Sequence, residues 1–309
     1  MSQFISKENV HEATDVPRIR SLMANAERLG AEDVVKLCRD RLIELAADTN
    51  RGKHRSTHAR IYQLNKNIEK IDLGYWLDKN PYYGATTPLP KSIKTAKTKL
   101  KDHLSIEFDF NFCGEITAAI ESKRQYYISS PSKDLAIEIF DLIMLWGGSE
   151  GVRLTKNSFY RSVRKNIDTW LPFYTKFIDE LLSPSNGNVD PIYALRQFGP
   201  IKGVGMSFAT KHLRWWGSYP IYDNRIGLLL YCASNISTIN EGSLSLYSKY
   251  LSDISKLSNI HDLTPLEVEK ALFGFSQNYF PNSNLDLVKA PSHTDQIEIA
   301  IKISAEAQI

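Results

Sequence analysis

Residues 201–205 read Ile-Lys-Gly-Val-Gly and stand between two segments, 190–198 and 206–216, whose apolar residues have helical spacing. The glycines on both sides of the valine allow positive φ and a close approach to a partner, because they carry no Cβ atom. The first segment opens with Asp190 and Pro191, which are typical of an N-cap and a first helical residue. The sequence therefore predicts two short helices joined by a tight glycine hairpin.

The second of these helices offers unpaired backbone amides and the positive end of a dipole at its N-terminus, which favour a phosphate group. Mobile positive charge stands nearby at Lys202 and Lys211. Residues 217–223 follow as Gly-Ser-Tyr-Pro-Ile-Tyr-Asp, and another helical segment begins at 224 and runs to 234. Asp223 is a ready N-cap for that segment, where amides and dipole keep a carboxylate ionised.

This combination, over residues 190–235, resembles the helix-hairpin-helix superfamily of DNA glycosylases, in which an apolar-Pro-Gly-apolar-Gly hairpin and a helix precede a loop that ends in Asp. Asp223 lies 18 residues beyond Gly205, in keeping with the family. The resemblance implies a helical bundle that binds double-stranded DNA, flips out a damaged or modified base and cleaves its N-glycosidic bond. Cleavage builds positive charge on the sugar, so Asp223 is the expected catalytic residue.

Two positions depart from the family pattern. Lys202 replaces the usual hairpin proline, and Ser207 stands where bifunctional members carry a lysine nucleophile. The chain is most similar to the bacterial 8-oxoguanine-glycosylase-like branch, and Ser207 implies a monofunctional enzyme, although Lys202 or Lys211 leaves a displaced lysine nucleophile open. DNA contacts are expected from the following residues: Lys202, Gly203, Val204, Gly205, Ser207 and Lys211.

A flipped base is held between apolar or aromatic groups. Trp216 and Tyr222 flank the loop before Asp223 and are the expected base-pocket residues, although helical spacing places most aromatics of this region in the core. The family's cysteine cluster is absent, so the resemblance implies no iron–sulfur cluster and allows only a structural monovalent cation at the hairpin. The excised base is not specified, because repair of host DNA and defence against modified phage DNA need the same chemistry.

Two other functions stay open. The hairpin is equally suited to a nucleic-acid-binding module without catalysis. A metal-dependent nuclease is a weaker alternative, prompted by Asp109 and the Glu-x-Lys pair formed by Glu121 and Lys123. Against it, residues 115–124 have a helical pattern, whereas such a pair is expected on a strand.

The remainder of the sequence sets the fold class as mainly α. Helices are predicted at 133–146, 157–182, 243–256, 265–274 and 294–306 besides those named above, and a small helical hairpin at 16–47. The one strand signal is the strict alternation at 105–113. We expect an N-terminal helical hairpin and basic arm at 1–70, a loop and basic helix at 71–103, and a glycosylase-like domain at 104–309.

Composition supports a globular protein, with 309 residues, 42% hydrophobic and 24% charged, and a net charge of only +3. Basic residues cluster locally, with six against one acid at 51–70 and five against one at 91–102, which suits phosphate contact as well as a solvated surface. Three scattered cysteines predict neither disulfides nor a metal site. No apolar run or signal-type segment is evident, so a soluble, cytoplasmic protein without membrane contact is expected, of undetermined oligomeric state.

Overall fold

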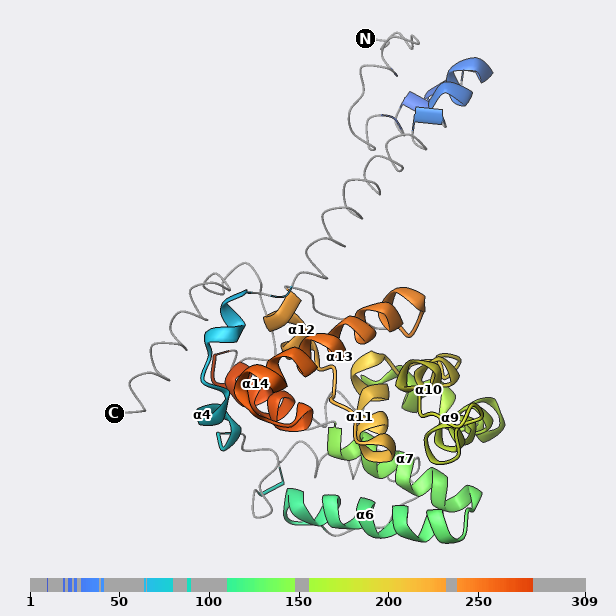
Figure 1. The fold of residues 1–309 in the computed structure, drawn as a ribbon. Helices are drawn as coiled ribbons and strands as arrows, with labels where there is room; N and C mark the ends of the chain where they lie inside the picture. The colour runs from blue at the N-terminus through green and yellow to red at the C-terminus, as the bar shows by residue number, and fades with distance from the viewer. Residues whose placement is uncertain are drawn as a thin grey trace. The chain divides into compact units, whose positions relative to one another are not determined.

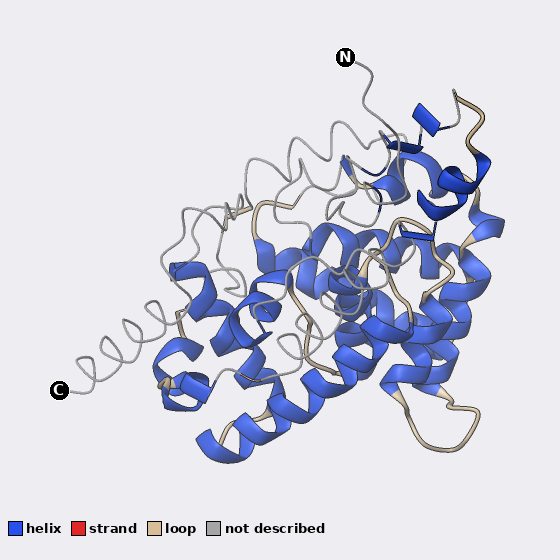
Figure 2. Cartoon of the chain, turned by 90° about the horizontal axis from the view of Figure 1, so that it is seen from above, coloured by secondary structure: helices blue, strands red, loops and turns tan. Residues whose placement is uncertain are grey.

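The computed structural model describes most of the chain beyond residue 110 and shorter stretches before it, as Figure 1 and Figure 2 show. The described residues are 10, 19, 22–23, 25–26, 29–38, 40–41, 64, 66–79, 88–89, 110–147, 156–231 and 238–279. The structure is 74% helical and has no strand within these ranges, which confirms the mainly α class. No helix in the same ranges combines the length and apolar character needed to cross a membrane.

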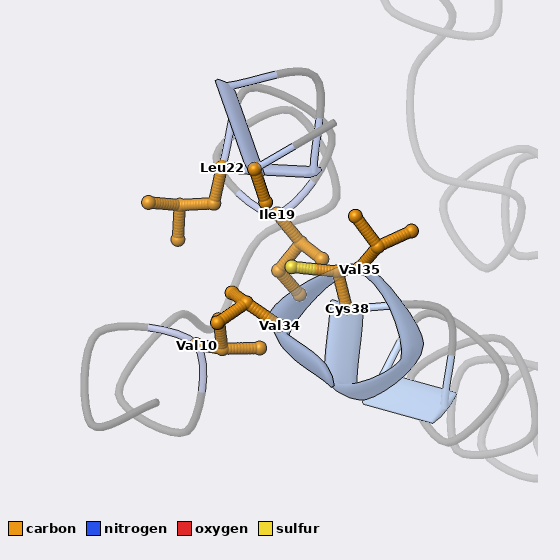
Figure 3. Close-up of a cluster of buried hydrophobic side chains, with 7 residues drawn as sticks. Val10, Ile19, Leu22, Val34, Val35 and Cys38 are labelled. Carbon is orange, nitrogen blue, oxygen red and sulfur yellow. The ribbon is translucent and has the colours of Figure 1, made fainter. Parts of the chain in front are cut away.

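Contacts divide the chain into two units, residues 1–62 and 63–309. The first unit has its own small hydrophobic cluster, and Figure 3 shows its side chains turned toward one another. A turn with Gly30 at a φ of 68° separates the helical residues before and after it, as expected for a helical hairpin within 16–47. The buried members of the cluster are Val10, Ile19, Leu22, Ala26, Val34, Val35 and Cys38.

The second unit is built from helices and short helical turns. In chain order they are η1 (Lys66–Lys70), α4 (Leu73–Leu77), α6 (Cys113–Ser129), α7 (Lys133–Gly147), η3 (Phe159–Val163), η4 (Ile167–Thr169), α9 (Leu171–Leu182), α10 (Pro191–Phe198), α11 (Met206–Gly217), α12 (Asn224–Tyr231), α13 (Glu241–His261) and α14 (Pro265–Tyr279).

The helices form two groups, with α11 drawn between them (Figure 1). On one side it packs against α7, α9 and α10, and α6 packs against α7. On the other side α14 packs against α4, α12 and α13, while α10 also contacts α13. The loop from α11 to α12 therefore runs between the two groups.

An aromatic core holds the first group together. The Phe140 ring of α7 lies 4.5 Å from the ring of His212 in α11 and 4.8 Å from that of Tyr174 in α9. Trp216 Nε1 donates to the Tyr174 hydroxyl at 2.9 Å, and that hydroxyl also forms a hydrogen bond with His212 Nδ1 at 3.0 Å. Burial, and then the charge of Lys211, lowers the pKa of His212 well below its ordinary value, so this histidine is a neutral core residue.

One predicted helix was wrong in part, and another lies where nothing is described. The predicted helix 157–182 is broken into a π-helical turn (η3), a 3-10 turn (η4) and α9. Pro172 explains the break, because it lies in the first turn of α9 and its ring cannot continue a helix from the preceding residues. The predicted helix 294–306 lies outside the described residues.

The strand prediction at 105–113 also needs correction at its end. Residues 105–109 lie outside the described ranges, and Cys113 begins α6 rather than ending a strand. Glu115 Oε2 accepts the backbone N–H groups of Asn111 and Phe112 at 2.5 and 3.1 Å, which starts the helix by a local cap. The described extended pairing is a single antiparallel bridge between Pro88 and Phe112.

Candidate active site

The predicted glycine hairpin forms between α10 and α11. Ile201 and Val204 are buried and anchor the turn, while Lys202 is exposed. Gly203 has a φ of 82°, the left-handed region that favours glycine. Gly205 instead has an extended conformation, φ −87° and ψ 175°, at the N-cap of α11. Of the two glycines that allow positive φ, Gly203 adopts it and Gly205 does not.

Gly203 lies against another part of the chain. A Cβ atom built on Gly203 would lie 2.5 Å from the backbone N of Phe159 and 2.6 Å from Ser158 Oγ. Backbone atoms at such a distance cannot give way without a shift of the main chain. In this structure the absence of a Cβ atom at Gly203 therefore allows the hairpin to pack closely against residues 158–159 of the same chain.

Asp223 is the N-cap of α12. Its Oδ1 accepts the backbone N–H of Arg225 at 2.9 Å, and its backbone carbonyl accepts the N–H of Gly227 at 2.9 Å. This confirms the capping interpretation, since a short polar side chain here satisfies an amide of the first turn.

The other carboxylate oxygen of Asp223 faces α11. Ser207 Oγ donates to Asp223 Oδ2 at 3.3 Å, and Lys211 Nζ lies 3.7 Å from the same oxygen. Lys211 Nζ also donates to Ser207 Oγ at 3.1 Å. The Asp223 side chain is 19% exposed and that of Lys211 11%. Three predicted site residues thus lie together, and all contacts stabilise a negative charge on the carboxyl group.

Lys211 is fixed in place rather than mobile, which corrects the prediction for this residue. A Cβ atom on Gly147, the last residue of α7, would lie 2.2 Å from Lys211 Cδ, so the lysine stem passes where a larger residue would stand. Its ammonium group lies 4.8 Å from the ring centroid of Phe208. The charge of Lys211 is directed to Asp223, whereas the exposed Lys202 remains available for a phosphate.

Three buried side chains fix the loop that leads to Asp223. The hydroxyl groups of Tyr247 and Tyr250 in α13 donate to the carbonyls of Pro220 and Ile221, both at 2.7 Å. The next amide, that of Tyr222, donates to Thr210 Oγ1 at 3.1 Å. Consecutive backbone groups are therefore held from α13 and α11, which fixes the position of the carboxylate that follows.

Sequence reasoning missed these three residues. The tyrosines recur three positions apart on the buried face of α13, and a buried tyrosine hydroxyl usually has a polar partner. That signal indicates a hydrogen bond but not the loop that accepts it.

A second carboxyl group, which the sequence pattern did not indicate, lies close enough to Asp223 to interact with it electrostatically. Glu269 of α14 is only 2% exposed, and α14 packs against α12, the helix that Asp223 caps. Burial raises the pKa of Glu269 to about 8, with opposing effects from Arg214, which lowers it, and Asp223, which raises it. The carboxyl group is therefore protonated at neutral pH in the folded state.

We expect Glu269→Gln to make the protein more stable at alkaline pH. The folded state keeps a proton that the unfolded chain loses above about pH 4.5, so the wild-type free energy of unfolding falls between about pH 4.5 and 8. Glutamine does not titrate, so the free energy of unfolding of the variant lacks this decrease. The difference in free energy of unfolding between variant and wild type should grow by roughly 3 to 5 kcal/mol from pH 5 to 8. Urea unfolding at pH 5, 6, 7, 8 and 9 measures it.

Glu267→Gln on the same helix is the control. Hydrogen bonds from Thr264 lower the pKa of Glu267, so its contribution to stability is present above pH 4.5 and is lost only below it. The free energy of unfolding of this control should change with pH as that of wild type does between pH 5 and 8. Parallel curves for Glu269→Gln would contradict a buried, protonated carboxyl group.

The two expected base-pocket residues belong to the core in this structure. Trp216 packs against Tyr127 with ring centroids 5.3 Å apart, besides its bond to Tyr174. Tyr222 packs edge-to-face on Tyr250 at 5.3 Å. Both rings are almost wholly buried, so neither presents a face for stacking on a base in this conformation.

The residues behind the nuclease alternative do not converge. Asp109 lies outside the described residues, and Glu121 and Lys123 lie in α6, where a spacing of two directs side chains to different faces. Lys123 is paired with Glu138 of α7. Within the described ranges no three His, Cys, Asp or Glu residues are placed to hold a metal ion.

Comparison of the chain with protein-family models, curated proteins and solved structures gives no match. The function therefore has to be inferred from the sequence pattern and from the geometry around Asp223.

Proposed function

We propose that this protein is a monofunctional DNA N-glycosylase that uses Asp223. The observation that supports this most directly is the fixed carboxylate at the N-terminus of α12, which follows a glycine hairpin at the spacing described above. Ser207, Lys211 and the Arg225 amide hold its two oxygens, and 19% of the side chain stays exposed for a substrate. Preorganised charge of this kind is what a developing cation requires.

In the proposed reaction the hairpin holds the DNA backbone. The amides at the N-terminus of α11 and the ammonium group of Lys202 bind phosphate, and the target base leaves the stack. As the N-glycosidic bond breaks, positive charge grows on the sugar, and the Asp223 carboxylate stabilises it or accepts a proton from the attacking water. Ser207 offers no amine, so water completes the reaction and leaves an abasic site and a free base.

The test is base release from a panel of duplexes that carry damaged or modified bases. Wild-type protein should release one class of base and leave sites that break only after alkali treatment. Strand breaks that need magnesium, need no alkali and persist in Asp223→Asn would instead identify a nuclease. A borohydride-trapped adduct that is lost in Lys211→Met would indicate a displaced lysine nucleophile in place of simple hydrolysis.

A DNA-binding module without catalysis is the second candidate. It is favoured by the pairing of Asp223 with Lys211 and by its complete N-cap, because both account for the aspartate without any substrate. This alternative predicts duplex binding by wild type and Asp223→Asn alike, with no base released from any member of the panel.

A further inference from the structure

The segment from Lys156 to Lys165 lies directly beside the hairpin. Gly203 approaches it so closely that an added Cβ would lie within 2.6 Å of both the Phe159 amide nitrogen and Ser158 Oγ. The segment carries four basic residues and no acidic one, and the first acid after it is Asp168. It was not among the basic clusters that the sequence singled out.

Three residues of this segment point inward and anchor it. Phe159 and Tyr160 are fully buried, and the Tyr160 hydroxyl donates to Asp141 Oδ1 of α7 at 2.9 Å. The Arg164 guanidinium donates to both oxygens of Asp141, Nε to Oδ1 at 3.2 Å and Nη2 to Oδ2 at 2.9 Å. A bidentate, buried pair of this kind fixes the orientation of the turn as well as its position.

The other three basic residues stay outside. Lys156, Arg161 and Lys165 are all exposed, as is Lys202 in the hairpin. Within the described part of the chain, none of the first three forms an ion pair. The anchored turn thus presents exposed positive charge next to the hairpin, and cations of this kind can replace the counterions of a phosphate.

We propose that Lys156, Arg161 and Lys165 form, with Lys202, one continuous phosphate-binding surface for duplex DNA. The identity of the partner rests on the proposed function, whereas the surface itself rests on exposure, charge and the contact at Gly203. The hairpin holds one part of the backbone, and the turn η3 extends the grip to neighbouring phosphates. Such contacts set position and affinity and carry no base specificity.

The proposal predicts a charge-dependent loss of DNA binding. Arg161→Gln and Lys165→Gln in the full chain should each weaken binding of a fluorescein-labelled duplex by about 3- to 10-fold at low salt. Each should also reduce the slope of log affinity against log salt by about 1, because one phosphate contact is lost. Fluorescence anisotropy over a series of KCl concentrations measures both quantities.

Lys133→Gln is the matched control, because it removes one exposed positive charge at the opposite end of α7 from Gly147. At 1.5 Å per residue Lys133 lies about 21 Å along α7 from Gly147 and about 12 Å from Asp141, where the segment is anchored. The control should bind within twofold of wild type with an unchanged slope. An equal loss of DNA affinity in the control would show that the effect depends only on net charge, and it would overturn the proposal.

The binding and base-release measurements distinguish failure of the phosphate-binding surface from failure of the proposed glycosylase function. If Lys202→Gln weakens binding while Arg161→Gln and Lys165→Gln do not, the extended surface is refuted and the glycosylase proposal stands. Absence of duplex binding by wild-type protein at low salt would refute both. Base release that persists with unchanged binding in the two variants would refute the surface alone.

Discussion

Asp223→Asn is expected to reduce base release by on the order of 10³-fold, the effect of removing an electrostatic group that acts on the transition state. Asparagine has nearly the same shape and can still accept the Arg225 N–H, so the cap of α12 should survive. What it lacks is the negative charge that the sugar cation needs. Single-turnover rates on the responsive duplex, together with thermal unfolding, separate this chemical effect from a loss of folded protein.

Asp190→Asn provides the matched control for that experiment. Asp190 caps α10 in the same way, with its Oδ1 accepting the N–H groups of Ile192 and Tyr193 at 2.8 and 3.2 Å. The substitution makes the same chemical change at an exposed cap away from the Ser207–Lys211 contacts, so activity should stay near wild type. Equal losses in both variants would assign the effect to capping.

DNA binding by Asp223→Asn gives a second, independent result. Removing a negative charge beside a phosphate-binding hairpin should leave affinity for duplex DNA equal or higher, because repulsion from the backbone falls. A variant that binds DNA but releases no base is the expected outcome. Retained base release would refute the assignment of Asp223 as the catalytic group.

Local signals made much of this fold predictable. Helices α7, α10 and α11 appear where periodic apolar residues predict them, and the Asp190-Pro191 start of α10 is a cap that a sequence displays directly. These features depend on residues close together in the chain, so the sequence is enough to indicate them.

Features that depend on distant segments were not predictable. Glu269 lies on α14 in a position that periodicity alone does not distinguish from an exposed one, and it is the packing of α14 among other helices that buries it. Lys211 was expected to be mobile, yet its direction is set by the absence of a side chain at Gly147, 64 residues earlier. A sequence pattern shows which residues are polar or small, but not which partner they meet.

Gly203 is another residue whose packing partner the sequence does not show. Its conformation was predicted from the hairpin, whereas its contact with the Phe159 backbone was not. Gly203→Ala should lower the free energy of unfolding by roughly 3 kcal/mol, because alanine at positive φ costs about 1 kcal/mol and the backbone clash adds the remainder. Urea unfolding of the variant against wild type measures the sum.

Gly187→Ala separates the two contributions. Gly187 has a similar φ of 73°, but an added Cβ would meet no atom within 4 Å. Its alanine variant should lose only about 1 kcal/mol, the conformational cost alone. The additional loss of free energy of unfolding in Gly203→Ala then measures how tightly the hairpin packs against segment 158–159. Equal losses at the two glycines would mean that the hairpin moves freely against that segment, and a rigid phosphate-binding turn could not be built on it.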